Sequence, residues 1–203
     1  MQSIARIIVF VLAILFALAT LRFFILPIEQ ANPEMAHHVM RRGIVFYLHV
    51  IFASLALALG VAQFQSGLRA ARPALHRWTG RLYAASVGLA APAGLILALA
   101  AAGGTMAAAG FSGLALAWAG ATTVAVVHAR ARRIAIHRRW MIRSYALTLA
   151  AVSLRLQAPV LSLLYATNYT GVSPIVAWSC WLPNILIAEW LIRRQSFAVQ
   201  PNR

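Results

Sequence analysis

The sequence predicts an all-α integral membrane protein, built as a bundle of six transmembrane helices. Of its 203 residues, 62% are hydrophobic and the mean hydropathy is +0.78, whereas a soluble domain is only about 45–50% apolar. The apolar residues also occur in continuous blocks of roughly 20 residues, the length of helix that spans the hydrocarbon layer of a membrane. The strands of a membrane β-barrel would instead alternate apolar and polar residues. Composition and block length together therefore predict helices packed in lipid.

Six apolar blocks are long enough to cross a bilayer. They cover residues of about 4–28, 43–65, 78–103, 106–129, 140–165 and 173–191. Because the loops between them are short, we expect residues 1–203 to form a single multi-pass domain. The first block has a second interpretation as a signal peptide, since Ala17, Leu18 and Ala19 form an acceptable cleavage signature. Its apolar residues continue to Ile28, beyond a typical signal-peptide core, so we expect an uncleaved helix.

The basic residues between the blocks predict the orientation in the membrane. All 18 are Arg, against three acidic residues, and the net charge is +15. Most of them fall in the N-terminus, the second loop, the fourth loop and the C-terminus, whereas the other side has only Arg41 and Arg42. The arginines of the first group are Arg6, Arg69, Arg72, Arg77, Arg81, Arg130, Arg132, Arg133, Arg138, Arg139, Arg193, Arg194 and Arg203. Basic loops stay in the cytoplasm, so we expect both termini on the cytoplasmic side of a bacterial inner membrane.

The same arginines predict the molecular partners. Because they lie between apolar blocks, we expect them to contact anionic lipid headgroups, and we expect no nucleic-acid partner. A second membrane protein or another copy of the chain remains a possible partner. The single Cys180 excludes a disulfide framework and a cysteine metal site. His37 and His38 lie beside Glu34, but adjacent residues do not share a helix face, so no metal site is predicted.

Two segments, at the starts of the third and fifth blocks, resemble each other. In each, a Trp is followed by Arg after three residues and Tyr after five, and a His precedes the Trp. The two sets are His76, Trp78, Arg81 and Tyr83, and His137, Trp140, Arg143 and Tyr145. One interpretation is a pair of independent anchors at the membrane interface, where aromatic rings and Arg are enriched. The interface residues would then be Arg77, Trp78, Arg81, Arg138, Arg139 and Trp140, with Tyr83 and Tyr145. The other interpretation is that His76 and His137 face a shared cavity and bind one ligand.

Charged residues inside two of the blocks predict an ion pair. Arg143 and Glu189 each lie roughly one turn from the cytoplasmic end of the fifth and sixth helices, which a short loop joins. Charges within a membrane are costly and usually face the bundle interior or water. We therefore expect these two side chains to pair. The pair is interpreted either as a structural clamp or as part of a ligand-linked or proton-linked site.

Arg155 and His49 are the other polar residues deep in the predicted membrane. Arg155 lies past the middle of the fifth helix, too far from the cytoplasm for its side chain to reach that interface. It is interpreted as part of a functional site or as a source of interhelical hydrogen bonds, with Gln157 and Asn184 as possible partners. His49 is interpreted as a hydrogen-bonded interior residue or as a ligand.

Proline and glycine predict local features of the helices. Pro92 and Pro183 fall inside the third and sixth blocks, where each is expected to kink its helix. Gly103 and Gly104 predict a tight turn between the third and fourth helices. Small residues of the fourth helix predict a close helix contact; they are Gly113, Ala117, Gly120 and Ala121.

Four motifs together resemble a bacterial family of predicted membrane proteins, the domain-of-unknown-function family 2306. They are the runs 75–83, 137–146, 153–155 and 181–184, which read LHRWTGRLY, HRRWMIRSYA, SLR and WLPN. The resemblance extends over nearly the whole chain after residue 40. It implies a helical bundle in the inner membrane. It supplies no chemistry, because none is assigned to the family.

The chain also resembles, more weakly, the ascorbate-reducible transmembrane cytochromes of the b type. In these, His residues on alternate helices bind haem in pairs, often with Gly four residues after a His. The resemblance implies His76 and His137 as axial ligands of one haem b, with Gly80 leaving room for the porphyrin edge. This sequence differs from the cytochrome pattern at Met141, which lies four residues after His137 at the position where the cytochromes often have Gly. No His is positioned to partner His49, so a second haem is not expected.

Two classes of function remain. The first is electron transfer or haem handling with a single haem on His76 and His137. The second is a non-redox membrane protein that binds or transports a small molecule or lipid, or that assembles with a membrane complex. In the second class, Arg155 and Glu189 would line a polar cavity. The sequence contains no Asp and no evident serine–histidine–acid set, which disfavours soluble-type hydrolysis, and whether the protein is an enzyme stays open.

Overall fold

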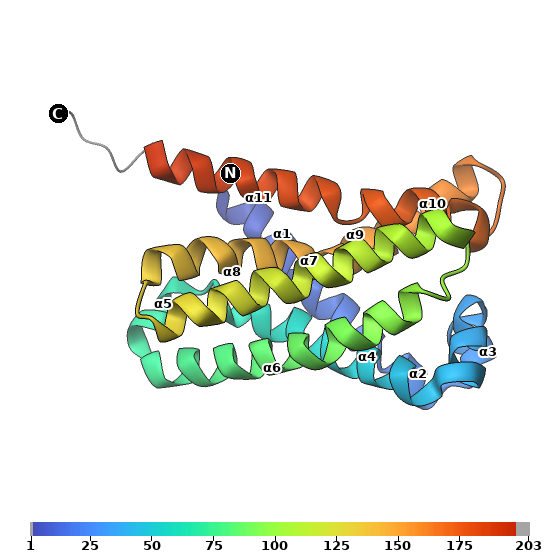
Figure 1. Ribbon diagram of the computed structural model, residues 1–203, viewed down its shortest axis with the longest axis horizontal. Coiled ribbons are helices and arrows are strands. Elements are labelled where there is room, and N and C mark those ends of the chain that lie inside the picture. The colour runs from blue at the N-terminus through green and yellow to red at the C-terminus, as the bar shows by residue number, and fades with distance from the viewer. Residues whose placement is uncertain (1, 198–203) are drawn as a thin grey trace.

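The protein is an elongated bundle of helices (Figure 1). The structure is a computed structural model and describes residues 2–197, which form helices and turns and contain no strand. The helices are α1 (Gln2–Ala19), α2 (Arg22–Ile25), α3 (Ile28–Ala31), α4 (Ala36–Gln63), α5 (Ser66–Ala71), α6 (Pro73–Ala98), α7 (Gly104–Arg130), α8 (Ile134–Thr148), α9 (Ala150–Leu164), α10 (Tyr169–Ser179) and α11 (Leu182–Phe197), with the 3-10 helix η1 (Pro33–Met35).

Six segments are long and apolar enough to cross a membrane, which confirms the all-α fold class. They are Ile7–Ile25, Pro33–Gln63, Pro73–Ala98, Gly104–Arg130, Ile134–Leu164 and Tyr169–Arg194. The second span begins ten residues before the predicted block, because it includes η1 and the polar start of α4. Helix α4 is kinked at Arg42, whose φ of −147° and ψ of 43° are not helical, and the predicted block begins directly after this kink. The fifth and sixth spans are each made of two helices, α8 with α9 and α10 with α11.

Of the prolines and glycines that the sequence analysis singles out for kinks and turns, Pro183, Gly103 and Gly104 lie at helix ends, whereas Pro92 lies inside a helix. The sixth span breaks at Cys180 and Trp181, so that Pro183 lies in the first turn of α11, where its missing N–H costs no hydrogen bond. Pro92 lies inside α6, which continues without a break to Ala98. Gly103 and Gly104 have φ of 97° and 75°, so the predicted glycine turn is confirmed.

Of the small residues that the sequence indicates on the fourth span, Ala121 and Ala117 pack in the core cluster, whereas the closest glycine contact lies one turn before Gly113, at Gly110. A Cβ on Gly110 of α7 would lie 2.8 Å from the Cβ of Ala177 in α10, and 2.9 Å from its carbonyl atoms. By contrast, a Cβ on Gly113 would be in ordinary contact, 3.6 Å from Trp181, and one on Gly120 would meet nothing within 4 Å. Gly110 therefore sets the distance between α7 and α10.

The two ends of the bundle differ in charge. At one end lie α5, the α7–α8 turn and the last turns of α11; we call it the basic end (Figure 1). Its arginines in the described residues are Arg69, Arg72, Arg77, Arg81, Arg130, Arg132, Arg133, Arg138, Arg139, Arg193 and Arg194. We call the other end, with α2, α3, η1 and the α9–α10 turn, the opposite end. Arg203, counted in the charge argument, lies outside the described residues.

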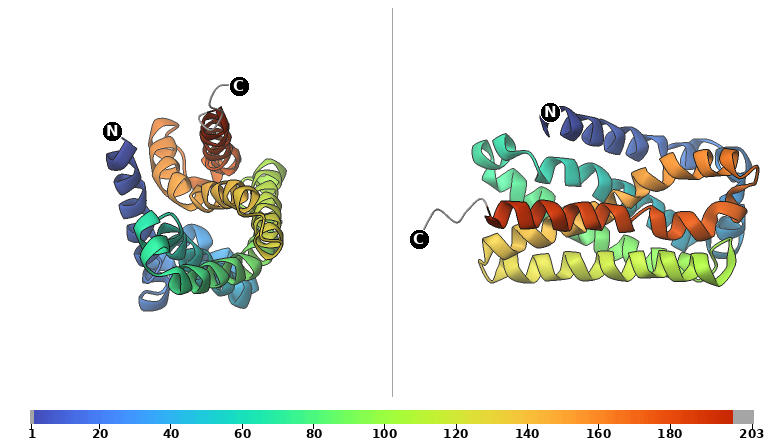
Figure 2. Two further views of the ribbon diagram at one scale, coloured as in Figure 1. Left: turned by 90° about the vertical axis from the view of Figure 1, so that its left-hand side faces the viewer. Right: turned by 90° about the horizontal axis from the view of Figure 1, so that it is seen from above.

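In the end-on view, the first five spans follow one another around the bundle in chain order, and α11 lies on the outside of α8 (Figure 2). Helix α4 packs on α6, α6 on α7, and α7 on both α8 and α10. Helix α1 lies at the edge, where it contacts α4 and α9. Neighbours in sequence are thus neighbours in space, as expected where short loops connect antiparallel helices.

A buried network of side-chain hydroxyls joins α6, α7 and α8. The Tyr83 hydroxyl hydrogen-bonds Ser144 Oγ at 2.7 Å and Thr148 Oγ1 at 2.8 Å. Trp118 Nε1 donates to Thr148 Oγ1 at 2.9 Å, and Thr122 Oγ1 lies 2.7 Å from Ser144 Oγ. All five side chains are buried, so each polar atom has its partner in protein rather than in water.

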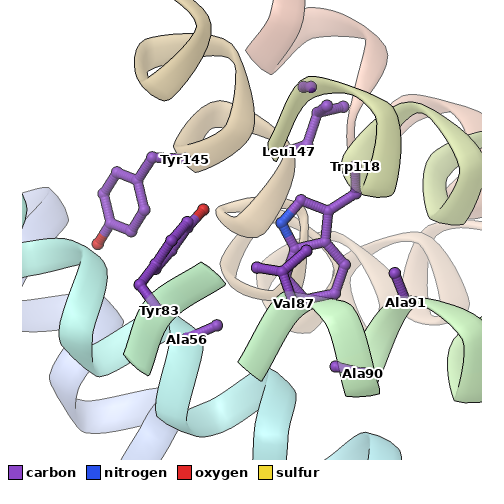
Figure 3. Packing of buried hydrophobic residues seen from close by; sticks show 9 residues of the cluster. Ala56, Tyr83, Val87, Ala90, Ala91, Trp118, Tyr145 and Leu147 are labelled. Atoms are coloured by element: carbon purple, nitrogen blue, oxygen red, sulfur yellow. The ribbon is translucent and has the colours of Figure 1, made fainter. Parts of the chain in front are cut away.

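The position of Tyr83 and Tyr145 corrects the sequence analysis, which expects both rings at the membrane interface. Tyr83 is fully buried and Tyr145 is 4% exposed. Figure 3 shows the Tyr83 hydroxyl pointing toward α8 and the Tyr145 hydroxyl toward α4, where it donates to the Leu57 carbonyl at 3.3 Å. A residue five positions after an interfacial Trp lies more than one turn deeper and on another helix face, so the tyrosines enter the core.

The Trp and Arg of the repeated motif stay together at the basic end. The Arg81 guanidinium lies over the Trp78 ring at 4.9 Å, and that of Arg143 lies over the Trp140 ring at 4.5 Å. Trp78 is 61% exposed, as a ring in contact with lipid would be. The other expected interface residues, Arg77, Arg138 and Arg139, are exposed in the early turns of α6 and α8. The three-residue spacing therefore produces the same cation–π stack twice.

The predicted Arg143–Glu189 ion pair is present and ties α8 to α11. Arg143 Nε donates to Glu189 Oε1 at 2.5 Å, and Arg143 Nη2 donates to Oε2 at 2.9 Å. The two side chains are 21% and 32% exposed. A bidentate pair in this partly buried position fixes the register of the two helices.

We expect Tyr83→Phe to lower the free energy of unfolding by about 1–2 kcal/mol, because the hydroxyls of Ser144 and Thr148 each lose a partner inside the bundle. Unfolding of the purified protein by dodecyl sulfate in mixed micelles measures this change. Tyr145→Phe is the matched control, since it removes only the single longer bond to Leu57. An equal loss of unfolding free energy in both variants would show that the hydroxyl network stabilises the bundle no more than the single Tyr145 bond does.

We expect Arg143→Gln and Glu189→Gln to be coupled by about 1 kcal/mol in a double-mutant cycle, between the values of an exposed and a buried pair. The same micelle unfolding experiment measures each single variant and the double variant. Arg81→Gln, which removes a stack but no ion pair, combined with Glu189→Gln serves as the uncoupled control. Additive effects of Arg143→Gln and Glu189→Gln would contradict the clamp.

Candidate functional site

A cavity of about 590 Å³ lies within the bundle, between its middle and the opposite end. Its walls come from α1, α2, α4, α6, α7, α8, α9 and the first residue of α10, together with the segment around η1. Small side chains in the lining leave this space open; they include Ala91 and Ala98 of α6 and Ala151 and Ala158 of α9. The polar residues of the lining are Thr20, Arg22, Asn32, Glu34, His38, His49, Trp118, Thr148, Arg155, Ser162 and Tyr169.

Arg155 projects into this cavity from α9 without a carboxylate partner. Its Nη1 donates to the Ala151 carbonyl at 2.9 Å, and within the part of the chain that the structure describes no carboxylate pairs with it. Arg155 lies nine residues before the end of its span at Leu164, which is about 14 Å of helix. A cation at that depth, in contact with a cavity, is a candidate for binding an anion.

The hydrogen-bond partners that the sequence analysis offers for Arg155 are both engaged elsewhere. Gln157 accepts a hydrogen bond from Ser179 Oγ at 2.6 Å, and Asn184 accepts one from Ser153 Oγ at 3.1 Å. Gln157 follows Arg155 by two residues, so it points to nearly the other side of α9, toward α10. The prediction that Gln157 or Asn184 satisfies Arg155 is therefore wrong.

His49 lies on the cavity wall in a fixed orientation. Its Nδ1 donates to the Ala90 carbonyl of α6 at 2.9 Å, since a carbonyl only accepts. The ring fills the space beside Gly94, where a Cβ would lie 2.9 Å from its Cε1 and Nδ1 atoms. This arrangement agrees with the interpretation of His49 as a hydrogen-bonded interior residue. The other ring nitrogen, Nε2, remains a hydrogen-bond acceptor.

A second, smaller cavity of about 60 Å³ also has both His49 and Arg155 in its lining. Thr20 of α1 and Ser54 of α4 complete its polar lining. A volume of this size is large enough for a few water molecules, and the four polar side chains are suited to hydrogen-bond them.

The charge of the large cavity is set by two arginines and one glutamate. Arg22 and Arg155 supply two cations, and Glu34, near the opposite end, supplies one anion. His38 also lines the cavity, and its buried Nδ1 has no hydrogen-bond partner. A small acidic group could therefore be bound by cations and by a free imidazole nitrogen.

His76 and His137 lie at the basic end, away from both cavities, whose linings contain neither residue. His137 Nδ1 donates to the Ala125 carbonyl of α7 at 2.9 Å, which leaves Nε2 free, the arrangement usual for a metal-bound His. His76 Nδ1 is buried without a partner, as is that of His128. Among the described residues, no group of three metal-binding side chains is present.

The surroundings of Gly80 do not fit the porphyrin edge that the cytochrome resemblance implies. A Cβ on Gly80 would lie 3.1 Å from Oε1 of Gln63, whose amide also donates to Thr79 Oγ1 at 2.7 Å. Gln63 of α4 thus occupies the face of α6 that a haem would need. His137 suits the role of a ligand, whereas Gly80 serves helix packing.

The sequence matches the model of a family of predicted membrane proteins, which agrees with the six apolar spans of the fold. The model of the family described as predicted membrane protein (DUF2306) matches residues 46–192, from the middle of α4 to the last turns of α11. No curated protein and no solved structure matches the chain. The match includes both copies of the repeated motif, the Arg143–Glu189 pair and Arg155. The protein therefore belongs to the DUF2306 family of predicted membrane proteins.

Proposed function

We propose that the protein binds an amphipathic small molecule with an acidic group, either to carry it or to move it across the membrane. The acidic group pairs with Arg155, and the apolar part lies along the alanine-rich wall of the large cavity. The observation that carries this proposal is that Arg155, at the surface of that cavity, has no carboxylate partner among the residues that the structure describes. The protein would be a non-redox membrane protein, one of the two classes that the sequence leaves.

The size and lining of the cavity support a ligand of this kind. A volume of about 590 Å³ falls within the range of small-molecule sites, which are mostly apolar with a few placed polar groups. Phe46, Phe111 and Leu114 supply apolar surface, and Arg155 and His49 supply the polar groups. An acyl chain can pack against the apolar residues, and a carboxylate or phosphate can hydrogen-bond to Arg155 and His49.

The electrostatics support an anion rather than a neutral polar group. An unpaired guanidinium in a membrane is costly, and a bound anion offsets that cost. The planar guanidinium suits a carboxylate or phosphate because it can donate two parallel hydrogen bonds. Arg155 uses Nη1 for the Ala151 carbonyl, so its other N–H groups remain for the ligand.

The location and orientation of the protein are part of the same proposal. The arginines of the basic end support a cytoplasmic position for that end, in contact with anionic lipid headgroups of a bacterial inner membrane. The cavity would then lie in the periplasmic half of the bilayer. Assembly with another membrane protein, or with a second copy of the chain, remains compatible with the many exposed apolar side chains.

We expect Arg155→Gln to weaken the binding of a dansyl-labelled fatty acid by about 10- to 100-fold, because hydrogen bonds to a charged group are lost. Fluorescence titration of the protein in lipid nanodiscs measures the dissociation constant. Arg41→Gln is the matched control, since Arg41 is exposed and is not part of the lining. The corresponding fatty alcohol should bind wild type and Arg155→Gln equally.

Equal affinity of wild type and Arg155→Gln for the labelled fatty acid would contradict the proposal. So would saturable binding that Arg41→Gln weakens to the same extent as Arg155→Gln. In either case the cation in the cavity would not be what holds the ligand.

Binding of a single haem b is the second candidate function. The observation that favours it is the Nδ1 bond of His137 to the Ala125 carbonyl, which leaves Nε2 free, together with the unpartnered Nδ1 of His76. If bound, the haem would supply electron transfer, and His76 and His137 would hold its iron. The contact of Gly80 with Gln63 weighs against it.

An absorption spectrum of protein purified in mild detergent from haem-replete cells tests the second candidate. With His76 and His137 as ligands, we expect a sharp α band after reduction with dithionite and about one haem per chain by pyridine haemochrome assay. His137→Ala should abolish that band, and His49→Ala should leave it unchanged. Colourless protein from haem-replete cells would exclude the haem hypothesis.

A further inference from the structure

We propose that the ligand reaches the large cavity sideways from the membrane, through the seam between α1 and α9, and that it is a single-chain anionic lipid. This inference rests on the proposed function, because it specifies the source and class of the same ligand. The seam is defined by Phe16 and Ala19 of α1 and by Pro159 and Ser162 of α9. All four residues line the cavity.

The exposure of these residues marks the seam as the mouth of the cavity. Ala19 and Pro159 are exposed, and Phe16 and Ser162 are half-buried. A side chain that lines a cavity and is also exposed on the outer surface lies where the two meet. Figure 2 shows α1 and α9 next to one another on the same side of the bundle. Because both belong to membrane spans, the mouth would open on lipid.

The seam is closed on the side of the basic end and open beyond it. Ala13 of α1 packs into a cluster with Leu57 of α4 and Val152 of α9. Both α1 and α9 run toward the opposite end from that point, so Ala19 and Pro159 lie at similar distances beyond the cluster. The two helices thus meet at Ala13 and separate beyond it around the cavity.

The first span is also the one least embedded in the bundle. In its most apolar stretch 17% of the residues are buried, against 44% in the third span. Movement of α1 away from α9 would therefore break few packing contacts. Helix α1 is held at Ala13 and, through Phe23 of α2, just beyond its last turn, so a shift of the residues between these two points can widen the seam without unfolding the helix.

The opposite end, by contrast, is covered by packed side chains. Phe23, Ala31, Phe46, Val50 and Leu97 form a buried cluster that holds α2 and α3 against α4 and α6. Phe23, Phe46, Val50 and Leu97 of this cluster also line the cavity, so packed side chains form part of its wall at that end. Ala19 and Pro159 at the seam are lining residues that are exposed, which favours entry from lipid.

The arginines indicate the class of lipid. Arg22, the first residue of α2, is exposed and lines the cavity, and Arg155 of α9 is a half-buried residue of the same lining. An anionic headgroup can bind Arg22 at the surface and then Arg155 inside, while its chain passes the seam. The cavity has the volume of one small molecule, so it accommodates one acyl chain better than the two chains of a diacyl phospholipid.

The test measures how fast a bound dansyl-labelled fatty acid exchanges from wild type and from variants with a narrowed route. Protein in nanodiscs is loaded with the label, unlabelled fatty acid is added, and energy transfer from Trp to dansyl is followed; Trp118 lines the cavity. Ala19→Phe narrows the seam, and Ala102→Phe narrows the opposite end of the same cavity. Phe adds no new Trp donor, and Pro159→Phe repeats the test from the α9 side of the seam.

We expect Ala19→Phe and Pro159→Phe to slow exchange by about tenfold or more, with Ala102→Phe within twofold of wild type, because the first two obstruct the route. If Ala102→Phe slows exchange and the seam variants do not, or if all three slow it alike, the sideways route is wrong while the proposed function stands. Unchanged rates in all three variants also overturn the route. Absence of any saturable exchange phase in wild type would overturn the proposed function itself.

Discussion

The hydroxyl network around Tyr83 holds the middle of this bundle together. In lipid, apolar contacts between helices gain little over contacts with acyl chains, so polar ties and close packing decide which helices meet. Tyr83, Ser144 and Thr148 link α6 to α8, and Trp118 and Thr122 bring α7 into the same network. Helices α6, α7 and α8 are fixed there, and the cavity lies directly beyond. Thr148 and Trp118 belong both to the network and to the cavity lining, so the packed core forms the floor of the candidate site.

The two arginines of the fifth span show how one residue type can serve two purposes at different depths. Arg143 lies near the basic end, stacks on Trp140 and pairs with Glu189, so its charge is fully compensated within the protein. Arg155 lies twelve residues further along the same span, and among residues 2–197 its hydrogen-bond partner is the Ala151 carbonyl. In the first arrangement the cation is paired within the protein, which suits the structural interpretation of the Arg143–Glu189 pair, whereas the second leaves guanidinium N–H groups available to a ligand. The contrast supports a binding role for Arg155 rather than a general need for buried arginine.

The repeated Trp–Arg–Tyr motif combines an interface anchor and a core residue in six positions. Trp and Arg three residues apart lie on one helix face, where they stack at the basic end in both copies. The Tyr two positions after the Arg points elsewhere and enters the interior, as Tyr83 and Tyr145 both do. Each copy therefore sets the depth and the rotation of its helix at the same time. For Tyr145 the fit is tight, because a Cβ on Gly60 of α4 would overlap its ring.

The six spans, the glycine turn and the Arg143–Glu189 pair could all be predicted from the sequence, because each depends on local quantities. Hydropathy over one segment, backbone freedom at Gly103 and Gly104, and the depth of two opposite charges need no knowledge of the packing. The cavity could not be predicted in this way, nor could the burial of Tyr83 and Tyr145 or the missing partner of Arg155. These depend on which face each helix turns toward its neighbours, and an all-round apolar sequence carries little signal of helix rotation. His49 and Arg155, separated by more than a hundred residues, line one cavity only because α4 and α9 pack around the same space.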